Sequence, residues 1–65
     1  MMEIGNKIKE LREKKELSQE QLGSLAYVTG ATINRIENGH HYPSRVVLKS
    51  IADALNVKVE DLKGE

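Results

Sequence analysis

Few side chains in this sequence could do chemistry, and those few favour binding over catalysis. Asn34 and Arg35 stand side by side, and both carry groups that form paired hydrogen bonds. His40 and His41 are also adjacent, but no third ligand lies nearby to complete a metal site. There is no cysteine, nucleophile–base pair, paired carboxylate site or phosphate-binding loop. We therefore expect a binding protein without metal, cofactor or small-molecule ligand, and not an enzyme.

The size and composition of the chain support the same conclusion. With 65 residues, 38% hydrophobic and 31% charged, residues 1–65 are expected to form one globular domain. So small a body does not readily enclose a substrate-sized cleft. No apolar run reaches the roughly 20 residues of a membrane span, and the first residues are too polar for a signal peptide, so we expect a cytoplasmic protein. Lys plus Arg is 10 and Asp plus Glu is 10, so net charge indicates no polyanionic partner.

The spacing of apolar residues predicts an all-α fold of five short helices. The first helix is expected to end at about Lys15, the second to cover 19–26 and the third 29–38; the fourth follows Ser44, and a last short turn ends the chain. No polar and apolar alternation persists over four residues, so strands are not expected. The expected inward positions are Ile4, Ile8, Leu11, Leu22, Leu25, Ala26, Ile33, Ile36, Leu48, Ile51, Ala52, Leu55, Val57, Val59 and Leu62.

Capping residues mark where these helices begin and end. Ser18 and Gln21 form the pattern of a capping box, in which each side chain binds the backbone N–H of the other residue. Thr29 and Ser44 are the expected N-caps of the third and fourth helices. The pair Asn38-Gly39, and later Asn56, tolerate the left-handed conformation that closes a helix.

The second and third helices are the most informative pair. A connection of about two residues forces their axes to cross steeply. Gly23 lies in the middle of the second helix, where glycine costs about 1 kcal/mol relative to alanine. Either the third helix abuts the second at this point and leaves no room for a side chain, or Gly23 is a surface residue without a role.

These features resemble the Cro and phage-repressor type of helix-turn-helix, the Xre family of transcriptional regulators. The resemblance extends from Ile4 to Leu62, with the motif at about 19–38, and implies a lambda-repressor-like domain that binds duplex DNA as a dimer. Its third helix would lie in the major groove. The matching residues are Ser18-Gln19, Gly23, Val28, Ile33, Ile36-Glu37-Asn38-Gly39, Pro43-Ser44 and the ending from Leu55 to Leu62.

The polar face of the third helix supplies the expected base contacts. The fork of Arg35 matches O6 and N7 of guanine, and Asn34 can read adenine in the same bidentate way. Ala31 and the methyl group of Thr32 suit apolar contact with a thymine methyl. The alternative for Arg35 is a solvated or phosphate-contacting arginine.

Phosphate contacts are expected from the helix starts and from the loop after the third helix. By resemblance, Gln19 touches a backbone phosphate, and exposed N–H groups at helix starts favour anions. That loop is commonly basic in relatives but holds histidines here, so we expect weaker binding at neutral pH and stronger binding below about pH 6.5. The expected phosphate contacts are Gln19, Thr29, Gly30, Asn38, His40 and His41.

Other residues are expected to build the scaffold. The resemblance implies an ion pair between Arg12 and Glu37 that joins the first and third helices. Tyr27 departs from the glycine typical of the turn, and costs on the order of 1 kcal/mol if φ there is positive. Lys58 replaces the usual small capping residue before the last helix.

Dimerisation is expected because one reading helix covers about half a turn of DNA, and specific sites then hold two half-sites about 34 Å apart. The available apolar surface is Tyr42, Val46, Val59 and Leu62. Completion of the core is the competing explanation for the last two.

The sequence therefore predicts a sequence-specific DNA-binding repressor that occupies an inverted-repeat operator and excludes polymerase. The alternative is a protein-binding adaptor of the same fold, such as an antitoxin or antirepressor partner. The neutral charge and the histidine loop favour it slightly, whereas the Ser18-Gln19 start and the intact helix-turn-helix register count against it.

Overall fold

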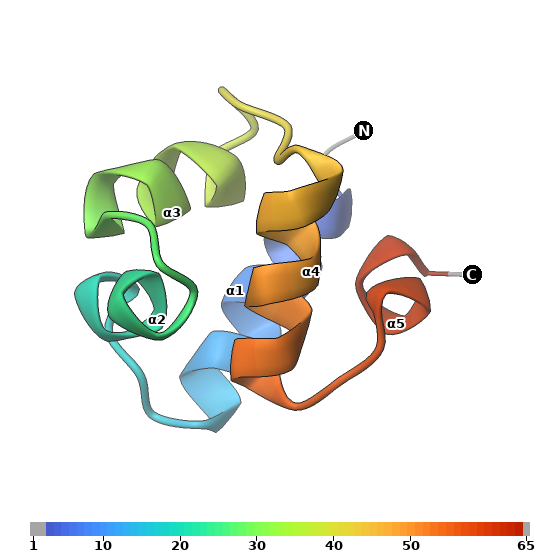
Figure 1. The fold of residues 1–65 in the computed structure, drawn as a ribbon, viewed down its shortest axis with the longest axis horizontal. Coiled ribbons are helices and arrows are strands. Elements are labelled where there is room, and N and C mark those ends of the chain that lie inside the picture. Colours follow the sequence, from blue (N-terminus) through green and yellow to red (C-terminus); the bar gives the residue numbers. More distant parts are fainter. Residues whose placement is uncertain (1–2, 65) are drawn as a thin grey trace.

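Five short helices account for most of the chain, as the apolar spacing predicts. The computed structural model describes residues 3–64, and these contain helices and no strand. Figure 1 shows α4 in the centre in front of α1, with α2 and α3 together on one side and α5 on the other. Within the described residues, every helix is too short or too polar to span a bilayer. The helices are α1 (Glu3–Lys14), α2 (Gln19–Leu25), α3 (Gly30–Glu37), α4 (Arg45–Leu55) and α5 (Val59–Lys63).

The core lies where the five apolar stripes meet. Leu11, Val57 and Val59 pack at its edge and are only partly buried. The expected burial of Leu25 is wrong, since its side chain is 53% exposed. Leu25 lies about 100° around the helix axis from Ser24, on the exposed side, and the seven-residue α2 buries only Leu22 and Gly23, followed by Ala26 at its C-cap. The buried apolar residues are Ile4, Ile8, Leu22, Ala26, Ile33, Ile36, Leu48, Ile51, Ala52, Leu55 and Leu62.

Three of the expected N-caps are confirmed by their hydrogen bonds. Gln21 N donates to Ser18 Oγ at 2.9 Å, and Ser18 N donates to Gln21 Oε1 at 2.8 Å, which completes the capping box. Thr29 Oγ1 accepts from Thr32 N at 3.1 Å, and Ser44 Oγ accepts from Val47 N at 3.2 Å. These bonds join residues three positions apart and mark the starts of α2, α3 and α4.

The helix ends differ in part from the expectation. Gly39 and Asn56 adopt left-handed conformations, with φ of 81° and 62°. Asn38 does not, because its φ is −89°, so the left-handed position after α3 belongs to the glycine alone. At the start of α5 the Lys58 side chain caps nothing, and instead Asp61 Oδ2 accepts from Lys58 N at 3.0 Å.

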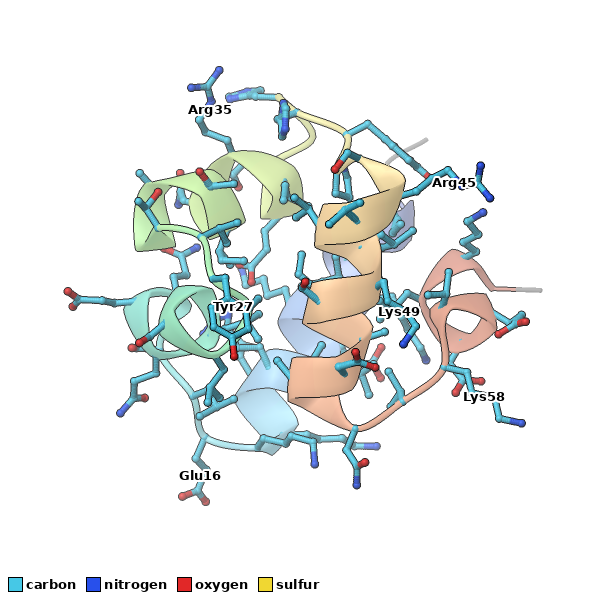
Figure 2. The ribbon with its side chains drawn as sticks, in the orientation of Figure 1. Glu16, Tyr27, Arg35, Arg45, Lys49 and Lys58 are labelled. Carbon is cyan, nitrogen blue, oxygen red and sulfur yellow. The ribbon has the colours of Figure 1, made fainter. Side chains whose placement is uncertain are left out.

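The turn between α2 and α3 depends on a glycine and carries a strained tyrosine. A Cβ on Gly23 would lie 2.7 Å from the carbonyl carbon of Thr29 and 2.8 Å from Val28 O, which confirms the packing explanation for this glycine. Val28 N also donates to Gly23 O at 2.8 Å. Tyr27 has φ of +64° and is 90% exposed (Figure 2). Burial of the ring therefore does not compensate for the energetic cost of the left-handed backbone.

A second close approach, at Gly5, did not emerge from the sequence. A Cβ on Gly5 would lie 2.5 Å from Ile36 O and 2.8 Å from Glu37 O. The start of α1 therefore rests directly on the backbone at the end of α3. Only the pairing of these helices, which are distant in the chain, reveals why this residue has no side chain.

We predict that Gly5→Ala destabilises the domain by about 1–3 kcal/mol, because the backbone of α3 must shift to admit the methyl group. This loss exceeds the roughly 1 kcal/mol that alanine gains in helix propensity. Urea unfolding followed by circular dichroism measures the change. The neighbouring exposed Asn6→Ala is the matched control and should be neutral or slightly stabilising; an equal gain in both variants would contradict the close packing.

We also predict that Tyr27→Gly stabilises the domain by about 1 kcal/mol, since glycine adopts positive φ without steric cost. Tyr27→Ala removes the same exposed ring but keeps the Cβ, so it should leave stability nearly unchanged. Thermal unfolding of the two variants side by side separates backbone strain from loss of the ring. Similar melting temperatures for both would show that the turn is not strained.

Candidate nucleic-acid interface

A buried ion pair anchors α3, the helix that carries the expected base contacts. Arg12 Nε donates to Glu37 Oε2 at 2.6 Å, and Arg12 Nη2 donates to Glu37 Oε1 at 3.1 Å. The two side chains are only 10% and 2% exposed. Arg12 Nη1 also donates to Leu17 O at 2.7 Å, so the guanidinium is bound on both sides. The ion pair implied by the resemblance is therefore confirmed.

The charge of this arginine is secure at neutral pH. The hydrogen bond to Glu37 raises the pKa of Arg12 above its ordinary value, against burial, which lowers it. A cation with a raised pKa keeps its stabilising contribution at every pH below its unfolded pKa, which for arginine lies far above neutral. At neutral and mildly alkaline pH the guanidinium of Arg12 therefore stays charged and able to pair with Glu37.

A chain of amide side chains extends from the ion pair to the outer face of α3. Gln19 Nε2 donates to Glu37 Oε1 at 3.0 Å, and Asn34 Nδ2 donates to Gln19 Oε1 at 3.3 Å. Asn38 Nδ2 then donates to Asn34 Oδ1 at 3.2 Å. The structure thus brings together Gln19, Asn34 and Asn38, three of the side chains that the sequence assigns to DNA contact.

Three of the four expected base contacts share an open hollow with the start of α2. Its lining residues come from both helices of the motif: Gln19, Glu20, Gly30, Ala31, Asn34 and Arg35. Figure 2 shows Arg35 extending from α3 away from the other helices. Gly30 lies against α2, and a Cβ there would be 2.9 Å from Glu20 Cα. Its missing side chain therefore allows the close contact between α2 and α3.

The histidine loop reaches the same surface at the other end of α3. Thr32, Arg35 and His41 line a second hollow, while His40 is exposed beside it. The hydroxyl of Thr29 donates to Thr32 Oγ1 at 3.0 Å, so both functions of that hydroxyl are already used within α3. For Thr29 to donate its hydroxyl hydrogen to a phosphate, the hydroxyl must give up its bond to Thr32 Oγ1.

Glu20 is a member of this surface that sequence reasoning missed. It follows Gln19 in the first turn of α2, is exposed, and lines the main hollow. A carboxylate at a base edge accepts from N4 of cytosine and repels phosphate. The sequence could have indicated this role, because Glu20 directly follows Gln19, an expected phosphate contact.

The residues expected to form a dimer separate into two groups. Tyr42 and Val46 are 59% and 76% exposed, as a contact surface requires. Val59 is partly buried against the core, and Leu62 is 1% exposed. Leu62 therefore completes the core of the single chain, and its assignment to a dimer surface is wrong.

Comparison with known proteins identifies the class to which this fold and surface belong. The family model HTH_3, described as Helix-turn-helix, matches residues 8–62, and the chain belongs to this family, the Xre type of helix-turn-helix regulators. Its membership confirms the expected fold class and the expectation of a regulator rather than an enzyme.

Individual relatives agree with that assignment. The chain is 42% identical over 57 residues to the uncharacterized HTH-type transcriptional regulator YgzD of Bacillus subtilis, covering 88% of this chain and 86% of YgzD. It is 33% identical over 64 residues to the immunity repressor of Bacillus phage phi105, covering 98% of this chain but 44% of that protein. The chain thus spans most of one relative and less than half of the other.

Two solved structures share the fold over nearly the whole chain. The restriction-modification controller protein C.AhdI from Aeromonas hydrophila has a TM-score of 0.91 at 31% identity, with 94% of this chain and 92% of that chain covered. The P22 c2 repressor, in complex with a synthetic operator, has a TM-score of 0.91 at 27% identity, with 95% and 96% covered.

We predict that removing one partner of the ion pair destabilises the domain more than removing both. Arg12→Met should cost about 3–5 kcal/mol because it leaves Glu37 buried and uncompensated. The double variant Arg12→Met, Glu37→Met should regain part of that loss, since no buried charge remains. Urea unfolding of single and double variants measures the difference, and losses that simply add would contradict the account.

Proposed function

We propose that this protein is a repressor that binds an inverted-repeat operator as a dimer, with α3 in the major groove. The observation that carries the proposal is the shared hollow in which Ala31, Asn34 and Arg35 lie beside Gln19, on a helix anchored by a buried ion pair. The likeness to the P22 c2 repressor, solved in complex with a synthetic operator, supports the same mode of binding.

The side chains divide the work of recognition. Arg35 reads guanine through its fork, Asn34 reads adenine, and Ala31 with Thr32 contacts thymine methyl groups. Phosphate contacts come from Gln19, from the backbone N–H of Gly30 at the start of α3, and from the loop after α3. The full set of proposed phosphate contacts is Gln19, Thr29, Gly30, Asn38, His40 and His41.

A second copy of the chain supplies the second half-site. Tyr42 and Val46 are exposed apolar residues, and Val59, which is partly buried, contributes further apolar surface. Two domains joined in this way place two α3 helices on successive major grooves about 34 Å apart. Occupation of such a site excludes polymerase and represses transcription.

A protein-binding adaptor is the second candidate function. A hollow away from α3 is mainly apolar and is lined by Leu17, Gln21, Ser24 and Leu25. Leu25, one of the lining residues, is half-exposed, and a protein partner would cover its side chain. This candidate becomes the preferred one if the chain binds DNA without sequence preference.

Selection from random duplexes, followed by sequencing, tests the proposal. We predict an enriched inverted repeat, and Arg35→Ala should lose preference at one base pair of each half-site, worth about 1–3 kcal/mol. Lys58→Ala is the control, because it removes one exposed positive charge at the far α5 end (Figure 2) and should leave the selected sequence unchanged. Binding that is weak, salt-sensitive and indifferent to sequence would contradict the proposal.

We further predict that lowering the pH from 8 to 6 strengthens operator binding several-fold. His41 lies beside Arg35 on the DNA-facing surface, where added positive charge strengthens contact with the phosphate backbone. The double variant His40→Ala, His41→Ala should bind with little change over this range. Fluorescence anisotropy at constant ionic strength measures both proteins, and a flat wild-type profile would show that protonation of the histidines does not strengthen binding.

A further inference from the structure

The polarity of the amide chain is determined at its buried end. An ionised carboxylate only accepts hydrogen bonds, so Gln19 must turn its NH₂ group toward Glu37 Oε1, where the distance is 3.0 Å. The oxygen of Gln19 then faces outward. Because that oxygen accepts, Asn34 must present its own NH₂ group to Gln19, at 3.3 Å. The orientation of the exposed Asn34 amide on α3 therefore follows from the buried carboxylate at the end of the same helix.

The same bonds leave Asn34 with a defined set of free groups. Nδ2 has two hydrogens and gives one to Gln19, while Oδ1 accepts one bond from Asn38 Nδ2 at 3.2 Å. One hydrogen and one acceptor position remain. Adenine in the major groove needs one donor for N7 and one acceptor for N6–H₂. The internal bonds of Asn34 thus leave one donor and one acceptor, which are the groups that adenine requires, and they fix which end of the amide carries each.

We infer that Gln19 is a positioning residue for base reading: by linking Asn34 to the buried Glu37, it sets the base preference at the pair that Asn34 contacts. This inference rests on the proposed DNA-binding function. It assigns Gln19 a part in specificity beside its phosphate contact, for which the second hydrogen of Nε2 remains. Phosphate contacts alone carry no sequence information, so the two parts are separable by experiment.

Two substitutions of Gln19 separate positioning from phosphate binding. Gln19→Lys keeps a donor for Glu37 and for phosphate but offers Asn34 no acceptor. Gln19→Met keeps the length of the side chain and neither donates nor accepts a strong bond. Arg12 still holds Glu37 in both variants, through bonds of 2.6 and 3.1 Å, and thermal unfolding verifies that each variant is folded. His40→Ala is the matched control, as a proposed phosphate contact outside the amide chain.

The experiment measures affinities of the full chain for its selected duplex and for duplexes changed at single base pairs. Asn34→Ala should lose a preference of at least about fivefold at one base pair. Gln19→Met and Gln19→Lys should lose most of the preference at that same base pair and keep it elsewhere, although Gln19→Lys binds all duplexes more tightly. Combining either with Asn34→Ala should remove no further preference. His40→Ala should weaken binding to all duplexes by the same factor.

A second measurement tests the chain without DNA. In the free protein, Gln19→Met should shift the side-chain NH₂ resonances of Asn34, and His40→Ala should not. Unchanged base preference in both Gln19 variants would overturn the inference while leaving the proposed function standing. Unchanged Asn34 resonances would overturn it in the same way. If wild-type protein selects no sequence, the proposed function fails and the inference falls with it.

Discussion

The buried ion pair between Arg12 and Glu37 is the interaction on which the arrangement of the binding surface depends. It joins α1 to α3, and through Gln19 it also holds the start of α2. Because both charges are almost fully removed from solvent, a displacement of α3 that separates them leaves an uncompensated charge in a low-dielectric interior. The pair therefore restrains α3 in one position, and a helix that reads base edges needs such a restraint. The fixed carboxylate of Glu37 also determines how the side-chain amides of Gln19 and Asn34 are oriented.

Three glycines determine how closely the neighbouring backbones approach α3. Gly5 allows α1 to rest on the end of α3, Gly23 admits the turn that leads into it, and Gly30 lets its first residue lie against α2. At each of these positions a Cβ would meet backbone atoms at less than 3.0 Å. A domain of this size has few apolar contacts with which to absorb a shift, so steric fit and charge pairing together fix the helix. Tyr27 shows that the turn tolerates backbone strain without losing this geometry.

Local features of the fold were predictable from the sequence, whereas features that depend on tertiary packing were only partly so. The capping box at Ser18 and the apolar stripe of α4 involve residues within one or two helical turns, so their patterns are direct. The role of Gly5 depends on a helix some 30 positions away, and no local pattern indicates it. Leu25 follows the apolar pattern but lies on the exposed side of α2. The polar members of the interface were identified by residue type, yet the hydrogen bonds that connect Gln19 to Asn34 required the structure.

The central claim is that the face formed by α3 and the start of α2 receives DNA in a position set by the buried ion pair. Titration of ¹⁵N-labelled protein with its selected duplex, against a scrambled duplex as control, tests this claim most directly. The account predicts that resonance changes specific to the selected duplex concentrate at Gln19 and along Gly30–Arg35, with the Arg12 guanidinium resonance retained in the complex. Changes centred instead on Leu17 and Leu25, or the same changes with both duplexes, would contradict it.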